Sequence, residues 1–175
     1  MGVFDIVRTK ISLNEKEEFY KKMIKVIKEI FGESPLFYYE VWSLLGIEYY
    51  FSESDAVYVW TKGGYNIGRY KEYYPIFIKV KKKDREVFEW YCEKLDLKKD
   101  KKGGVFYKVK SEVNLKFEDC EGIPVQSFKE TIKFMKKNKY NFEPALEMVK
   151  ELYNKKIKAK YKEVIVNVWF GTEGE

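Results

Sequence analysis

Basic side chains are concentrated in the middle of the chain, and they have the clearest chemical use. Residues 61–110 carry 15 basic and 7 acidic side chains, whereas the net charge of the whole chain is +6. In a strand, alternating Lys79, Lys81 and Lys83 would share one side, as a row of cations along a nucleic-acid backbone requires. A solvated strand end would give the same pattern. The predicted nucleic-acid- or phosphate-binding residues are Lys62, Arg69, Lys71, Lys79, Lys81, Lys82 and Lys83.

A glycine-rich segment, Gly63-Gly64-Tyr65-Asn66-Ile67-Gly68-Arg69, lies within this basic region. Consecutive backbone N–H groups in such a turn can surround an anion, and an arginine can bind a phosphate with two parallel hydrogen bonds. The spacing is not that of a Walker loop or a dinucleotide-binding fingerprint. A simple hairpin turn is the alternative interpretation.

Acidic residues offer a second chemistry, the binding of a hard divalent cation. Glu118 and Asp119 stand at the end of a predicted strand, and Glu112 precedes them. Carboxylates in such positions can hold magnesium, which is the cofactor that the sequence suggests. A solvated acidic loop is the alternative, and no catalytic residue can be assigned.

Several other chemistries are excluded by composition. The chain has no histidine and only two cysteines, Cys92 and Cys120, which lie far apart. Histidine-dependent acid–base catalysis is therefore absent, and we expect neither zinc nor haem. Two isolated thiols also fit a reducing cytoplasm better than a disulfide framework.

Aromatic side chains are abundant, with 15 tyrosines, 13 phenylalanines and 4 tryptophans. Clusters such as Tyr49-Tyr50-Phe51 lie beside charged residues, and exposed rings next to cations can stack on nucleic-acid bases. Rings on strands are more often core residues or cross-strand pairs, so both interpretations stay open.

The elements that must position these residues follow from hydrophobic periodicity and from glycine, proline and capping signals. Strands are predicted at 3–11, 47–51, 56–61, 73–80, 105–109, 113–117 and 164–170. Helices are predicted at 14–31, 36–45, 84–95, 127–137 and 141–154. This order predicts an α+β fold with a mixed, largely antiparallel sheet covered by helices.

Length and composition indicate one domain over residues 1–175, with a disordered tail at 171–175. The chain is 45% apolar but has no run long enough to span a membrane and no signal-peptide pattern at its start, so we expect a cytoplasmic protein that avoids membranes. Lysine and glutamate dominate its 35% charged residues, as in proteins of thermophiles.

Three segments together resemble the nucleotidyltransferase fold, in particular its archaeal and bacterial branch of abortive-infection and toxin–antitoxin proteins. They are IEYYFSESDAVYVWTKGGY, RYKEYYPIFIKVKKKDREVFEWYCEKLDL and GIPVQSFKETIKFMKKNKYNFEPALEMVKEL. They are similar to the family's glycine motif, its metal-binding strand with the following helix, and its C-terminal helical pair.

The signature residues differ from those of the family. Ser52-Glu53-Ser54 stands where the family has Gly-Gly or Gly-Ser, and Tyr73-Tyr74-Pro75 stands where it has Asp-x-Asp. Its third carboxylate would fall near Glu112 or Asn114, and its helical lysine at Met135. The resemblance therefore implies a relative that has lost the two-metal centre but keeps a basic, aromatic cleft.

The leading hypothesis is a nucleic-acid-associated domain, non-catalytic or weakly catalytic, that binds RNA or DNA. One alternative is a magnesium-dependent phosphoryl-transfer enzyme or nuclease that uses the carboxylates named above. The other is a structural or regulatory module that binds a protein partner.

Overall fold

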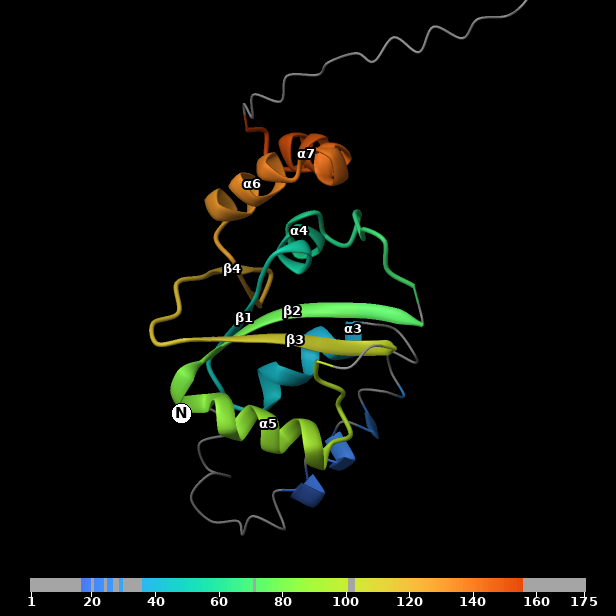
Figure 1. Cartoon of the computed structure of the whole chain (residues 1–175), viewed down its shortest axis with the longest axis vertical. Helices are drawn as coiled ribbons and strands as arrows, with labels where there is room; N and C mark the ends of the chain where they lie inside the picture. The colour runs from blue at the N-terminus through green and yellow to red at the C-terminus, as the bar shows by residue number, and fades with distance from the viewer. Residues whose placement is uncertain are drawn as a thin grey trace, which may run out of the picture.

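The computed structural model describes residues 17–19, 21–23, 25–26, 29, 36–70, 72–100 and 103–155 (Figure 1). The strands predicted at 3–11 and 164–170 and the tail at 171–175 lie outside these residues. The described residues between 17 and 29 are helical, as predicted for that segment. No helix within the described part of the chain has the length and apolarity that a membrane span requires.

A five-stranded mixed sheet forms the centre of the fold. Its strands are β1 (Tyr49–Phe51), β2 (Tyr73–Lys81), β3 (Gly104–Glu112), β4 (Glu118–Cys120) and β5 (Ile123–Val125), in the order β3-β2-β1-β5-β4. The β1–β2 and β4–β5 pairs are antiparallel, whereas β2–β3 and β1–β5 are parallel. The predicted α+β class is confirmed, although antiparallel pairing does not predominate among the described strands.

One face of the sheet is covered by helices α3 (Leu36–Glu40), η1 (Val41–Leu44) and α5 (Arg85–Lys94), as Figure 1 shows. Alternate residues of β2, from Tyr74 to Val80, are buried on this side. Trp42 of η1 stacks on Phe88 of α5 with ring centroids 4.2 Å apart. The buried alternate residues of β2 and the aromatic packing between the helices therefore hold this helical layer on the sheet.

The opposite face is covered by α4 (Ser54–Trp60), α6 (Phe128–Lys137) and α7 (Lys139–Leu152), which lie above the sheet in Figure 1. Ser127 caps α6, because its side chain accepts a hydrogen bond from the Glu130 N–H. Met135 of α6 and Val57 of α4 are fully buried in the second core cluster. The sheet thus lies between two helical layers, each with its own apolar core.

Two predicted strands were wrong. Residues 56–61 fall largely in helix α4, because their apolar side chains pack between the sheet and α6–α7. A short apolar run of that kind fits a buried helix as well as a strand. Residues 113–117 form no strand, and Val113 and Phe117 are exposed. Conversely, residues 123–125, for which no strand was predicted, pair as β5 beside β1.

Both cysteines are buried and free. Cys92 lies on α5 beneath the sheet, and burial raises the pKa of its thiol to about 12. Burial likewise raises the pKa of Cys120 on β4. Neither thiol is a nucleophile at neutral pH, because thiolate formation requires a lowered pKa.

Candidate functional site

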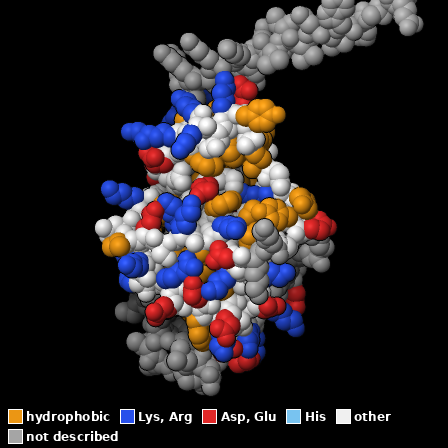
Figure 2. Space-filling view, viewed as in Figure 1, with side chains coloured by type: hydrophobic (Ala, Val, Ile, Leu, Met, Phe, Trp, Pro, Cys, Tyr) orange, Lys and Arg blue, Asp and Glu red, His pale blue; other side chains and the backbone are white. Residues whose placement is uncertain are grey.

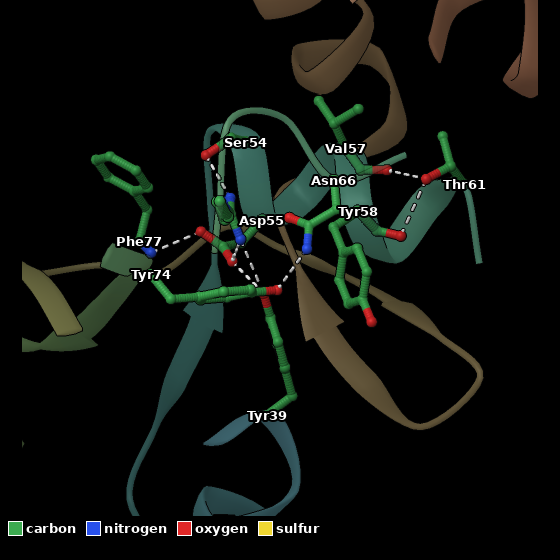
Figure 3. A network of polar contacts seen from close by, with 10 residues as sticks. Tyr39, Ser54, Asp55, Val57, Tyr58, Thr61, Asn66, Tyr74 and Phe77 are labelled. Carbon is green, nitrogen blue, oxygen red and sulfur yellow. Dashed lines mark hydrogen bonds and ion pairs between the residues drawn. The ribbon is translucent and has the colours of Figure 1, made fainter. Parts of the chain in front are cut away.

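A buried ion pair connects the start of α4 to the glycine-rich segment (Figure 3). Arg69 Nη1 lies 2.7 Å from Asp55 Oδ1, and the two side chains are 2% and 0% exposed. Asp55 also accepts a hydrogen bond from the Tyr39 hydroxyl and one of 2.7 Å from the Phe77 backbone N–H. Its carboxylate therefore has three donors, which a buried charge requires.

The Arg69 guanidinium makes further contacts besides the ion pair. Nη2 donates to Ser54 Oγ at 2.6 Å, and the group lies 5.0 Å from the centroid of the Tyr74 ring. The Tyr74 hydroxyl in turn accepts a hydrogen bond of 3.1 Å from Asn66 Nδ2. This placement corrects the predicted surface role of Arg69, since the guanidinium holds the fold together in the interior instead of facing a phosphate.

The charges of this pair depend on each other. Burial raises the pKa of Asp55, against the lowering effects of Arg69 and of the three donated hydrogen bonds. Burial also opposes the charge of Arg69, but Asp55 outweighs it and raises the guanidinium pKa. Arg69 is therefore always cationic, and its charge is the largest influence that favours the ionised Asp55 carboxylate.

The ion-pair network anchors a strained turn between β1 and α4. Glu53 has φ 56° and ψ −126°, which is unfavourable for any residue that carries a Cβ atom. On either side of it, the Ser52 N–H donates to the Phe77 carbonyl at 2.9 Å and the Asp55 N–H donates to the Ser52 carbonyl at 3.1 Å. We call this turn, Ser52 to Ser54, the elbow.

The elbow presents the Glu53 side chain to the neighbouring strand. Its carboxylate lies 2.6 Å from Lys110 Nζ of β3, and the two side chains are 29% and 63% exposed. The Glu53 backbone N–H donates to Gln126 Oε1 at 3.4 Å. An exposed pair of this kind contributes little to stability, so it does not by itself offset the strained backbone.

Glu53→Gly is expected to stabilise the protein by about 1 kcal/mol, because relief of roughly 1–3 kcal/mol of backbone strain exceeds glycine's entropic cost and the lost ion pair. Glu53→Gln is the matched control, since it removes the charge and keeps the Cβ atom. Urea denaturation of both variants measures the difference. A Glu53→Gly protein less stable than Glu53→Gln would show that the elbow is unstrained.

A pocket of about 420 Å³ lies next to the elbow, between the sheet and α6. Side chains from β1, β2, the β3–β4 connection, the β5–α6 junction and α6 line it. They are Tyr50, Lys79, Lys116, Gln126, Ser127, Glu130, Lys133, Phe134 and Lys137. We call this the basic groove, because four lysines face one glutamate. Figure 2 shows Lys and Arg side chains gathered over α6 and continuing toward the sheet.

The cations of the basic groove differ in how they are paired. Lys79 lies 2.6 Å from Glu112, which also accepts a hydrogen bond of 3.0 Å from the Tyr50 hydroxyl. Partial burial opposes the charge of Glu112, but the bonds from Lys79 and Tyr50 outweigh it and lower its pKa. Lys116 and Lys137 are exposed and form no salt bridge with any described residue. The groove therefore keeps unneutralised positive charge.

Only one residue of the predicted basic row lies in this groove. Lys79 lines it, whereas Lys81 and Lys83 both pair with Glu48, at 2.6 and 3.0 Å. Lys82 is exposed at the start of the short helix η2 (Lys82–Asp84). These three lysines therefore lie outside the lining of the groove, although Lys81 ends the same strand that carries Lys79.

The two other predicted lysines are not in the groove. Lys62 follows α4 and pairs with Glu121 at 2.7 Å. Lys71 lies outside the described residues. The segment from Gly63 onward is held by its Asn66 and Arg69 side chains as described above, so its main contacts are internal.

The three carboxylates predicted for magnesium do not meet. Glu112 pairs with Lys79, Glu118 accepts the Phe128 N–H at 3.1 Å, and Asp119 accepts the Gly122 N–H at 2.9 Å. In the described segments, no three acidic or cysteine side chains are grouped closely enough to hold a metal ion. Glu118 and Asp119 instead stabilise the N-terminus of α6 and the β4–β5 turn.

Sequence reasoning missed most of the groove residues. Lys133 and Lys137 lie four positions apart on α6, so they share one face, and that spacing was the available signal. No spacing in the sequence indicates that Lys116 and Gln126 lie near these lysines, because the pairing of β5 with β1 brings them to the groove.

Comparison with protein-family models, with curated proteins and with solved structures finds no match to this chain. The geometry of the basic groove is therefore the basis on which a function can be proposed.

Proposed function

We propose that this protein is a nucleic-acid-binding domain, non-catalytic or weakly catalytic, and that the basic groove holds the sugar–phosphate backbone. The observation that carries this proposal is the lining of the groove by four lysines and one glutamate. A backbone that places its phosphates there would release condensed counterions, which is the main driving force for such binding.

The polar lining suits a phosphodiester chain. Lys116 and Lys137 have no acidic partner among the described residues and can bind phosphates directly. Lys133 is paired with Glu130 at 2.6 Å, but that pair is exposed, and exchanging its carboxylate for a phosphate costs little. Gln126 and Ser127 add neutral hydrogen-bonding groups between these cations.

The proposal of weak or absent catalysis is supported by the arrangement of the carboxylates. Metal-dependent phosphoryl transfer needs several of them around one or two cations. The β2 residues where the resembled family would carry them are Tyr73, Tyr74 and Pro75. A degenerate relative of the nucleotidyltransferases thus remains a proposal that fits the absence of those side chains.

A cytoplasmic location is proposed together with this function. Both described cysteines are free and buried, so the fold uses no disulfide. A protein that binds nucleic acid inside a cell would meet the reducing conditions in which such thiols persist.

Fluorescence anisotropy with a labelled single-stranded oligonucleotide tests the proposal. We expect saturable binding. The logarithm of the association constant should fall with the logarithm of the salt concentration, with a slope of about −2 to −3 if three or four phosphates are neutralised. Absence of binding at about 50 mM salt would contradict the proposal and favour a protein partner.

A further inference from the structure

An exposed aromatic ring stands at the rim of the basic groove. Phe117, in the β3–β4 connection, is 44% exposed, although phenylalanine normally lies inside. Its ring stacks on that of Tyr50, with centroids 5.8 Å apart and planes inclined by 24°. Tyr50 itself is only 4% exposed and lines the groove.

The supporting tyrosine is held firmly. Its hydroxyl donates to Glu112 at 3.0 Å, and Lys79 Nζ lies 5.5 Å from the centre of its ring. Phe117 therefore rests on a ring that is fixed by a hydrogen bond and by a neighbouring cation. An aromatic surface ordered in this way loses little entropy when another flat ring stacks on it.

Cations flank this aromatic pair. Lys116 precedes Phe117 in sequence and lines the groove, and Phe134 of α6 lines it as well. Aromatic rings that alternate with cations are the arrangement by which proteins bind unpaired bases and the phosphates between them.

We propose that the basic groove takes single-stranded nucleic acid, with one base stacked on Phe117 and the adjoining phosphate bound by Lys116. In a duplex the bases are paired and stacked, so their faces are closed to Phe117 and only the backbone remains to be bound. This inference rests on the proposed function, and it adds the strand state of the ligand.

The test compares a labelled single-stranded oligonucleotide with its duplex, for the full chain and for Phe117 variants. Phe117→Leu, which keeps an apolar side chain but removes the π-face, should weaken single-strand binding about tenfold and leave duplex binding unchanged. Phe117→Trp should bind at least as tightly as the original protein. Val113→Ala is the matched control, because Val113 is exposed in the same connection and has no ring.

A base analogue gives an independent signal. The fluorescence of a single strand that contains 2-aminopurine should change when it binds, because the base changes its stacking partner, and Phe117→Leu should abolish that change. Equal affinity for single strand and duplex with an unaffected Phe117→Leu variant would overturn the inference while the proposed function stands. If the unmodified protein binds neither the single strand nor the duplex, the proposed function itself is wrong.

Discussion

Asp55→Ala is expected to lower the free energy of unfolding by about 3–5 kcal/mol, the largest effect of any single substitution considered. The variant leaves the Arg69 guanidinium buried without its carboxylate, and the Tyr39 hydroxyl and the Phe77 N–H lose their acceptor. Each orphaned donor adds a desolvation cost. Chemical denaturation monitored by tryptophan fluorescence would measure the loss.

Two controls separate the buried charge from other effects. The double variant Asp55→Leu/Arg69→Met removes both charges together and should recover most of the stability, because apolar replacements avoid the unpaired ion. Glu121→Ala breaks the exposed pair with Lys62 and should cost less than about 1 kcal/mol. If Asp55→Ala were no more harmful than Glu121→Ala, the ion-pair network would not hold the elbow.

Charge reversal of Lys116, Lys133 and Lys137 together is expected to weaken nucleic-acid binding about 100-fold or more. Each lysine that binds a phosphate contributes about one unit to the salt dependence, and a glutamate in its place repels the backbone. The slope of the logarithmic salt plot should therefore flatten. All three side chains lie at the surface, so circular dichroism should show an unchanged fold.

Reversal of Lys81, Lys82 and Lys83 provides the matched control. It changes the net charge by the same amount, but these residues lie outside the basic groove, and two of them pair with Glu48. We expect a reduction of at most a few fold from long-range electrostatics. Equal losses from the two triple variants would mean that overall charge, and not the groove, governs binding.

The long periodic elements were predictable from the sequence. β2, α5 and α6 lie where alternation, capping and three- to four-residue spacing predicted them. The short elements were less certain, because α4 has seven residues and its apolar run also fits a strand. β5 has three residues and forms by pairing with β4 on one side and β1 on the other.

The candidate site was harder to predict, since long-range contacts assemble it. Lys79 was predicted to bind nucleic acid and does line the basic groove, but Lys116 and Lys133 are brought to the groove by the β5–β1 pairing and the helix that follows. Arg69 was predicted to bind phosphate because it ends the glycine-rich segment, but its side chain is buried against Asp55. No local sequence pattern indicates that Arg69 forms a buried ion pair with Asp55.

Photo-crosslinking of a uridine-containing single strand, with the linked peptides mapped by mass spectrometry, would locate the bound bases on the protein. Photoexcited uracil reacts with a ring on which it stacks, so we expect adducts on Phe117, the exposed ring at the rim of the basic groove. Adducts should disappear at high salt along with binding. Crosslinks confined to residues 81–83, or no crosslinks when the protein is saturated with the strand, would show that the bases do not lie in the basic groove.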